Sequence, residues 1–231
     1  MHAIFVHGLG RTPLSALPLL LPLRKAGISC HVLGYLAATE DTDRVAARLK
    51  RKIDKLNQAP YILIGHSLGG VIIRKLLTGA QAPKNLPLWV FLLGSPTGAS
   101  RLAHKLQHHP LFRLFAGDAG QLLGNAQRMA AIGAPNLQLG IPCTAIIGTR
   151  GIGGRMPPFY GESNDGIVAK SEVTAPWLLE DRLGECIELP LPHTLLPSSR
   201  RVAKVIIERL STGTSTDRDR STAHSQDSDS Q

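Results

Sequence analysis

The fold is decided by the stretch Tyr61-Ile62-Leu63-Ile64-Gly65-His66-Ser67-Leu68-Gly69-Gly70. Its first four residues are apolar and rich in β-branched side chains, which predicts a buried strand. Val71 to Leu77 is an apolar run of helical character, so a helix is expected to follow. A G-x-S-x-G motif between a strand and a helix presents its serine, here Ser67, as a nucleophile at the top of a sheet. The alternative is a strand-to-helix turn with an incidental serine.

The glycines of this motif have a steric purpose. A serine in a tight, strained turn needs neighbours without side chains, because Cβ atoms two positions away would collide with the strand or the helix. Gly65 and Gly69 hold those two positions around Ser67. The two glycines therefore fit the tight turn that carries a nucleophilic serine.

Length and composition predict one folded domain followed by a tail. The chain has 231 residues, of which 43% are apolar, enough for one full-sized core. From Ser211 onward the composition changes to Ser, Thr, Asp, Arg and Gln, with almost no apolar residues and no periodicity. We expect a folded domain over 1–210 and a disordered polar tail over 211–231.

The net charge is +9, and the tail contributes more aspartates than arginines. Such a basic domain predicts attraction to anionic substrates or surfaces, and weak peripheral contact with an anionic membrane stays open. No aromatic-interleaved basic motif is present, so nucleic-acid binding is not expected. The longest apolar run, Leu14 to Leu23, is too short for a bilayer span and contains two prolines. Without a secretory n-region and h-region, we expect a soluble, cytoplasmic protein.

The cysteines indicate neither a disulfide framework nor a metal site. Cys30, Cys143 and Cys186 are scattered in strand-like stretches without CxxC spacing. Three thiols with apolar neighbours are typical of reduced core residues. No metal and no cofactor are expected.

The rest of the chain alternates apolar strands with helical segments. Buried strands are predicted over 2–6, 28–33, 61–64, 88–93, 143–147 and 186–189, and helices over 41–56, 71–77 and 200–210. A proline-rich segment after the first strand predicts a helix that begins late or is kinked, with Thr12 as its cap and Pro13 at its first position. The pattern predicts an α/β fold with a mostly parallel sheet of about six strands and helices on both faces.

A serine nucleophile needs an imidazole that takes its proton and a carboxylate that orients the imidazole. In elbow-type enzymes these follow in the order serine, acid, histidine. His193 is the only histidine after Ser67 that follows the end of a strand, and we predict it as the general base. His66 adjoins the serine but is expected to point away from it, as an elbow-packing residue.

Asp165 is the predicted acid. It lies in Asn164-Asp165-Gly166, a turn sequence before His193 that can direct a carboxylate. Because Asp-Gly is also a common turn pair, an ordinary turn aspartate is the alternative. The carboxylates that compete for this role are Asp118, Glu162, Glu180 and Asp181.

The oxyanion hole of such a site combines the N–H after the nucleophile with one from the loop after the first strand. The first is that of Leu68. For the second we choose Leu9, because Gly8 and Gly10 on either side allow close backbone approach.

Together these motifs resemble the α/β-hydrolase family, most closely small lipases and esterases without a large cap. They are the strand followed by HGLG, GHSLGG, Gly94-Ser95-Pro96-Thr97-Gly98, Asn164-Asp165-Gly166-Ile167-Val168 and Pro192-His193-Thr194-Leu195-Leu196. The resemblance covers 1–210 and implies Ser67 as nucleophile, Asp165 as acid, His193 as base and the amides of Leu9 and Leu68 as the oxyanion hole. Three features depart from the family pattern: the first strands of the full fold are missing, two prolines follow HGLG, and Pro192 precedes the histidine.

The expected reaction is hydrolysis of a small-molecule or lipid ester through an acyl-enzyme. An acyltransferase or thioesterase with the same triad, and a non-catalytic module that binds an anionic membrane or a partner, are the alternatives. The region 98–140 mixes leucines and phenylalanines with basic residues. It is read as an ordinary helix with a core face and a basic face, interrupted at Pro110, in preference to a flap over the serine.

Overall fold

The computed structural model describes residues 1–153 and 157–212, and these form one sheet with helices around it. The strand order is β2-β1-β3-β4-β5-β6, and every neighbouring pair is parallel. The strands are β1 His2–Val6, β2 Ser29–Leu33, β3 Tyr61–His66, β4 Trp89–Leu93, β5 Cys143–Gly148 and β6 Gly184–Leu189. The predicted α/β sheet of about six strands is confirmed.

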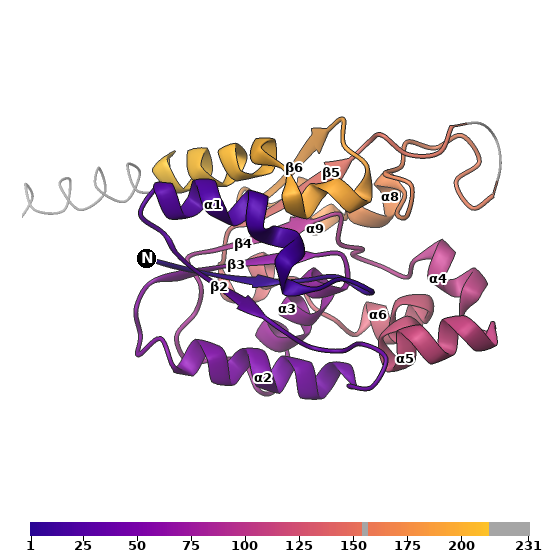
Figure 1. Ribbon diagram of the computed structural model, residues 1–231, viewed down its shortest axis with the longest axis horizontal. Coiled ribbons are helices and arrows are strands. Elements are labelled where there is room, and N and C mark those ends of the chain that lie inside the picture. The colour runs from indigo at the N-terminus through magenta and orange to yellow at the C-terminus, as the bar shows by residue number, and fades with distance from the viewer. Residues whose placement is uncertain (154–156, 213–231) are drawn as a thin grey trace, which may run out of the picture.

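The helices cover both faces of the sheet (Figure 1). They are α1 Leu17–Lys25, α2 Thr42–Asp54, α3 Leu68–Thr78, α4 Arg101–Leu106, α5 Pro110–Gly124, α6 Ala126–Ala130, α7 Pro135–Leu139, α8 Lys170–Val173, α9 Pro176–Leu179 and a closing helix over 200–212, with 3₁₀ turns at η1 Pro13–Ala16 and η2 His193–Ser198. Figure 1 shows α1 and the closing helix on one side of the sheet and α2 on the other. No helix within the described ranges combines the length and the apolarity that a bilayer span requires.

The two faces bury alternate residues of the same strands, as the pleat of a strand dictates. Phe5 and Ile64 pack in one core with α1 and the closing helix. Val6 and Leu63 pack in the other core with α2 and α3. Because both faces are covered, the strands are apolar along their whole length, which explains why the sequence predicts parallel strands.

The amphipathic helix predicted over 41–56 is α2. Its N-cap is Asp41, whose carboxylate accepts a hydrogen bond from the N–H of Arg44 at 2.7 Å. Val45, Leu49 and Ile53 recur every four residues and are buried. The helix therefore forms and docks where its apolar period predicts.

The proline-rich segment resolves into two short helices. Thr12 occupies the N-cap position of η1, without a capping hydrogen bond from its side chain, and Pro13 begins the turn. The α-helix starts only at Leu17, with Pro18 in the first turn, where no N–H is needed. Pro22 lies inside α1. Of the two predicted outcomes, a late start and a kink, the late start is the one observed.

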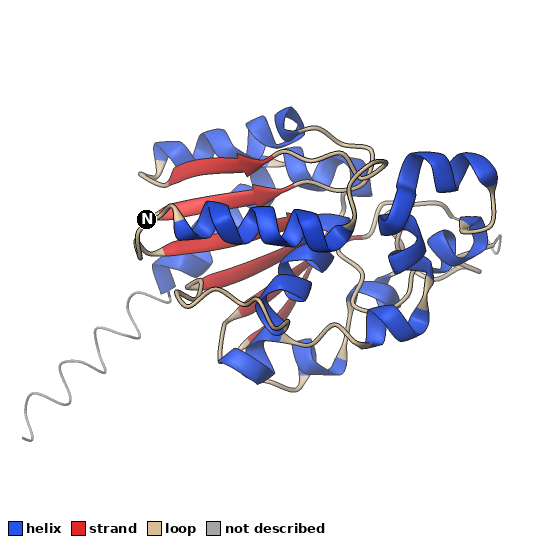
Figure 2. Ribbon diagram, turned by 90° about the horizontal axis from the view of Figure 1, so that it is seen from below, coloured by secondary structure: helices blue, strands red, loops and turns tan. Residues whose placement is uncertain are grey.

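The carboxyl ends of the strands meet at one edge of the sheet. Figure 2 shows all the strand arrowheads pointing toward the end of the molecule where α4–α6 lie. The strand order reverses between β1 and β3, so the crevice between their ends is a switch point where such sheets bind ligands. The register pairs Val6 with Gly65, which brings the loop after β1 beside Ser67.

At the C-terminus the closing helix runs two residues beyond the predicted domain boundary, through 212. The remainder of the predicted tail, 213–231, lies outside the described residues, as do 154–156. The division into a domain over 1–210 and a tail stays a prediction.

Candidate active site

Ser67 occupies the turn between β3 and α3 with φ 52° and ψ −122°. Residues other than glycine rarely adopt a positive φ, and such a conformation costs about 1–3 kcal/mol. The surrounding contacts impose it: the N–H of Ser67 donates to the carbonyl of Leu93 on β4 at 2.9 Å, and α3 begins at the next residue. The sharp turn places the serine beyond the carboxyl end of the sheet.

The glycines around Ser67 allow three backbone segments to touch. A Cβ on Gly65 would lie 2.4 Å from the Cα of Gly70, and a Cβ on Gly69 would lie 2.1 Å from the carbonyl oxygen of Val6. A Cβ on Gly8 would lie 2.9 Å from the Cβ of Ser67. The first two contacts agree with the steric role argued from the motif, and the third shows how closely the HGLG loop approaches the serine.

His193 and Asp165 form a buried pair at the ends of β6 and β5. The Nδ1–H of His193 donates to Oδ2 of Asp165 at 2.6 Å, and the backbone N–H of His193 donates to the carbonyl of Asp165 at 2.8 Å. The side chains are 7% and 1% exposed. Since Nδ1 carries the proton in this bond, Nε2 is the ring nitrogen that can accept one. Ser67 and His193 line the same cavity.

The loop that carries Asp165 is fixed by its own hydrogen bonds. Oδ1 of Asp165 accepts from the N–H groups of Ile167 and Val168 at 3.0 and 2.8 Å. Oδ1 of Asn164 accepts from the N–H of Gly166 at 3.0 Å, and Gly166 has φ +98°. One carboxylate oxygen thus holds the turn, and the other is directed at His193.

Three of the four competing carboxylates have other contacts. Asp118 accepts hydrogen bonds from Thr42 and Arg128, and Glu162 accepts from Arg101 and Ser171. The carboxylate of Asp181 accepts from the N–H of Leu183. Each of these bonds ties a helix or a turn to its neighbour, and none involves His193.

His66 lies on the cavity wall beside His193, which corrects the expectation that it points away from the site. Its Nε2–H donates to the backbone carbonyl of His193 at 3.1 Å, and the two ring centroids are 4.7 Å apart. Chain direction alone misplaced this side chain, because the η2 turn brings His193 back over β3. Burial lowers the pKa of His66 well below its usual value, so the ring is neutral. Nδ1 is buried and has no hydrogen-bond partner among the described residues.

The loop after β1 is supported from beneath by Tyr35. The phenol O–H donates to the carbonyl of His7 at 2.6 Å, and its ring stacks on that of His7 at 4.2 Å. Leu9 follows at the cavity wall. Leu68 is the first residue of α3, where an N–H has no intrahelical acceptor. Leu9 thus lines the same cavity as Ser67, and Leu68 follows Ser67 directly in the chain.

A cavity of about 260 Å³ opens over Ser67. Its wall is predominantly apolar and is contributed by the HGLG loop, α4, α5, the loop after Asp165 and η2. The large apolar side chains from α4 and α5 in this wall are Leu102, Leu106, Phe112 and Leu123. An apolar cleft with a few polar groups at one end is the usual form of a small-molecule site.

The region 98–140 differs from the single interrupted helix predicted for it. Pro110 begins α5 at its first turn, and the backbone bends at Gly117, where φ is 50° and a Cβ would lie 2.7 Å from the carbonyl of Ala37. Phe112 faces the cavity, whereas Leu114 and Phe115 are 66% and 69% exposed. No local sequence pattern encodes this division, because it depends on how α5 packs against α4.

Arg74 is a buried residue that the sequence analysis did not single out. It lies on α3, is 1% exposed, and donates to the carbonyls of Pro96, Thr97, Ile132 and Gly133 at 2.9–3.3 Å. Its guanidinium also lies over the ring of Trp177. The sequence signal is weak, because Arg74 and Lys75 are adjacent charged residues in the otherwise apolar run after the GHSLGG motif, and nothing local shows which of them is buried. These bonds tie the helix that follows Ser67 to the wall of the cavity.

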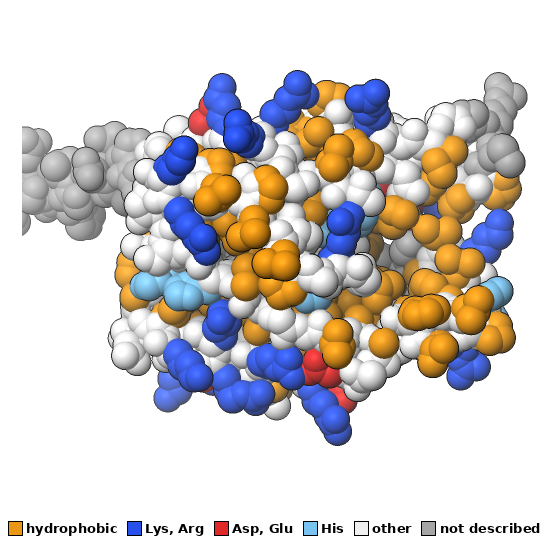
Figure 3. All heavy atoms as spheres, viewed as in Figure 1, with side chains coloured by type: hydrophobic (Ala, Val, Ile, Leu, Met, Phe, Trp, Pro, Cys, Tyr) orange, Lys and Arg blue, Asp and Glu red, His pale blue; other side chains and the backbone are white. Residues whose placement is uncertain are grey.

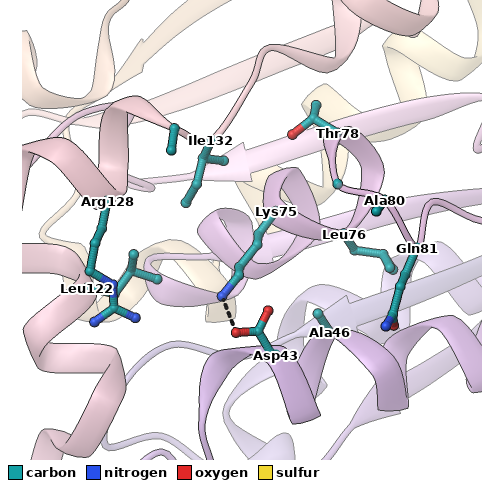
Figure 4. A pocket seen from close by; sticks show the side chains of 12 residues that line it. Asp43, Ala46, Lys75, Leu76, Thr78, Ala80, Gln81, Leu122, Arg128 and Ile132 are labelled. Carbon is teal, nitrogen blue, oxygen red and sulfur yellow. Dashed lines mark ion pairs between the residues drawn. The ribbon is translucent and has the colours of Figure 1, made fainter.

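A second cavity of about 460 Å³ lies between α2, α3 and α6 (Figure 4). Figure 4 shows Lys75 pointing toward Asp43, and the two form an ion pair of 2.9 Å. Arg128, on the opposite wall, pairs with Asp118. None of the described residues that line the Ser67 cavity contributes to this second one.

In the ranges 1–153 and 157–212, no three His, Cys, Asp or Glu side chains are grouped so that they could hold a metal ion. The three cysteines are free thiols. Cys143 is buried, which raises its pKa to about 12, and Cys30 and Cys186 are half-buried. None of the three lines the Ser67 cavity.

The chain belongs to the alpha/beta hydrolase family, whose sequence model matches residues 3–223. A search of curated protein sequences finds no significant match. Among solved structures, the chain is similar to the mature lipase BlEst2 of Bacillus licheniformis, with a TM-score of 0.67, 20% identity and coverage of 90% of this chain and 91% of the lipase. A monoacylglycerol lipase of Paleococcus ferrophilus gives a TM-score of 0.65 at 15% identity, with coverage of 92% and 94%.

The thioesterase RedJ of Streptomyces coelicolor is also similar, with a TM-score of 0.59, 17% identity and coverage of 93% of this chain and 89% of RedJ. At these identities the likeness concerns the fold. The fold and the family are those expected from the sequence, and the chemistry of this chain is argued from its own residues.

Proposed function

We propose that this protein is a serine hydrolase that cleaves carboxylic esters, with Ser67 as nucleophile, His193 as general base and Asp165 as its orienting acid. One observation carries the proposal. A serine held at positive φ shares a cavity with a histidine whose Nδ1–H is bound to a buried carboxylate. Together these features leave Nε2 of His193 available as a base on the side of the ring that is not occupied by Asp165.

The reaction takes place in two steps. Ser67 Oγ attacks the ester carbonyl as His193 Nε2 takes its proton, and the tetrahedral oxyanion accepts hydrogen bonds from the N–H groups of Leu9 and Leu68. The C–O bond then breaks, and His193 gives the proton to the leaving alcohol. Water, activated by the same nitrogen, attacks the acyl-enzyme and releases the carboxylic acid and Ser67.

The acyl chain is proposed to lie against the apolar wall formed by α4 and α5. Hydrolysis of p-nitrophenyl esters of graded chain length, from acetate upward, tests the activity and the fit together. Ser67→Ala is the matched control because it removes only the hydroxyl. A wild-type rate no greater than that of Ser67→Ala at every chain length would reject the proposal.

Two other functions can be distinguished from ester hydrolysis by experiment. A thioesterase or acyltransferase would use the same residues, and the structural likeness to RedJ favours testing it. Partitioning of the acyl-enzyme between water and an added alcohol or thiol measures the acceptor directly. A non-catalytic module would bind its partner and leave a fluorophosphonate probe unreacted.

Weak contact with an anionic membrane is a further part of the proposal. Figure 3 shows apolar side chains gathered on the surface of the part formed by α4 and α5. Leu111, Leu114 and Phe115 are exposed there, next to Arg113. Co-sedimentation with anionic and neutral vesicles tests this contact, with Phe115→Ser as the weakened variant. Cytoplasmic location stays a prediction.

A further inference from the structure

Arg11 is a charged residue at a site that is otherwise apolar or neutral. It follows the HGLG loop directly and lines the cavity over Ser67 together with Leu9, His193 and Thr194. Among the described residues that line this cavity, Arg11 is the only one whose side chain is a lysine, arginine, aspartate or glutamate. A cation at the mouth of an apolar cleft has a strong influence on which substrates enter it.

The guanidinium of Arg11 is held in place without being neutralised. Nη2–H donates to the backbone carbonyl of Thr194 at 3.0 Å. No carboxylate of the described residues forms an ion pair with it, whereas Arg101, Arg128 and Arg209 each have one. A guanidinium has five N–H donors in a planar fork that suits carboxylate and phosphate groups. Most of these donors therefore remain available to a ligand.

The charge of Arg11 acts on His66, the residue that precedes Ser67 in the chain. Burial is the main cause that lowers the pKa of His66, and the nearby charge of Arg11 lowers it further. Because Arg11 lines the same cavity as Ser67 and His193, an anion bound next to Arg11 would lie in the cavity where the ester reacts.

The position of Arg11 also selects one side of the substrate. In ester cleavage His193 must protonate the leaving oxygen, so the leaving group lies against the His193 side of the cavity. Arg11 is bonded to Thr194, the residue after His193. The apolar chains that would hold the acyl group, Leu106 and Phe112, come instead from α4 and α5.

We propose that the substrate is an ester whose alcohol part carries an anionic group, a carboxylate or a phosphate, and that Arg11 binds this group. The inference rests on the proposed hydrolase function and names the substrate class of the same site. Arg11 acts by binding the leaving group and takes no proton. The acyl part stays apolar, and the two halves of the substrate are recognised by different elements of one cavity wall.

The test compares matched neutral and anionic esters. One pair is 4-nitrophenyl butanoate and 3-carboxy-4-nitrophenyl butanoate, and the second is a monoacylglycerol and the same compound with a 3-phosphate. The first pair probes a carboxylate and the second a phosphate, so the pair that responds shows which anion fits. For each pair the ratio of kcat/KM for the anionic to the neutral ester is measured. Intrinsic differences in reactivity cancel when this ratio is compared between variants.

In Arg11→Gln the ratio should fall about tenfold for at least one pair, mainly through KM, as expected for one lost charge-assisted contact at a partly exposed site. Arg11→Lys should retain part of the preference, and 0.5 M salt should reduce it in the wild type. Arg51→Gln, an exposed arginine on α2, serves as the matched control and should keep the wild-type ratio.

Three outcomes decide between the alternatives. An equal loss on neutral and anionic esters in Arg11→Gln would mean that the guanidinium only supports the His193 loop through Thr194, which overturns the inference. An unchanged ratio for both pairs overturns it as well, while hydrolysis of the neutral esters still supports the proposed function. Absence of hydrolysis of all four esters by the wild type overturns the proposed function and this inference together.

Discussion

Replacement of Gly69 by alanine perturbs the serine turn by one methyl group. In the structure that Cβ would lie 2.1 Å from the carbonyl oxygen of Val6 and 2.7 Å from its carbonyl carbon. Ordinary contacts at this position would be at least 3.4 Å, so β1 and α3 must separate by about 1 Å. Val6 lies within the sheet and Gly69 lies in the first turn of α3, so neither can move alone.

Overpacking of this kind lowers the free energy of unfolding by about 1–3 kcal/mol. A displacement of about 1 Å between a nucleophile and its base lowers the rate about 100-fold. We therefore expect Gly69→Ala to lose about 1–3 kcal/mol in urea denaturation and about 100-fold in kcat/KM on a p-nitrophenyl ester. Activity is measured on protein shown to be folded by circular dichroism, so that the two losses are separated.

Gly98→Ala is the matched control for this experiment. No heavy atom lies within 4 Å of the Cβ that it would carry, and its φ is not positive. We expect its stability to change by no more than about 0.5–1 kcal/mol and its activity to stay within about twofold. Wild-type stability and activity in Gly69→Ala would refute the steric account of the motif.

Three further predictions concern the groups around the serine. Asp165→Asn should lower kcat about 10⁴-fold with little change in KM, because the amide forces the proton of His193 onto Nε2. A loss of kcat below tenfold would contradict the role of Asp165 as the orienting acid. Arg74→Met should lower the free energy of unfolding, measured in urea, by about 2–5 kcal/mol, because four buried carbonyls lose their donor. Arg74→Lys should lose less, and equal stability of the wild type and both variants would be inconsistent with these hydrogen bonds. Below about pH 6.5 the unfolded chain protonates His66 and the folded chain does not, so this residue lowers the free energy of unfolding by up to about 1.4 kcal/mol for each unit by which the pH falls. His66→Gln should flatten this slope between about pH 6.5 and 5, and identical slopes in the two proteins would argue against a buried neutral ring.

The parts of the fold that follow from local sequence could be predicted well. Each strand is a short apolar run, and Val45, Leu49 and Ile53 recur at the period of a helix, so these elements were found close to their observed bounds. The need for glycine at 65 and 69 could also be argued, because it depends on atoms within a few residues of Ser67. Two starts were set too late: α3 begins at Leu68, directly after the serine, and not at Val71, and β6 begins at Gly184 and not at Cys186.

The parts that depend on contacts between distant segments could not be predicted in the same way. The position of His66 depends on η2 folding back across β3, which no local pattern encodes. The partners of Arg74 come from two loops more than 20 residues away in the chain. The cavity wall formed by α4 and α5 depends on a bend at Gly117 and on a short connection at Pro110. The composition of this region therefore could not show which of its apolar side chains line the cavity.

The central claim is that Ser67 is a nucleophile activated by His193. Reaction with a fluorophosphonate, followed by intact-mass and peptide mass spectrometry, tests it most directly. We predict one label per chain, located on Ser67, absent in Ser67→Ala and formed at least 100-fold more slowly in His193→Ala. A wild-type chain that remains unlabelled, or a label that forms equally fast in Ser67→Ala, would contradict the claim.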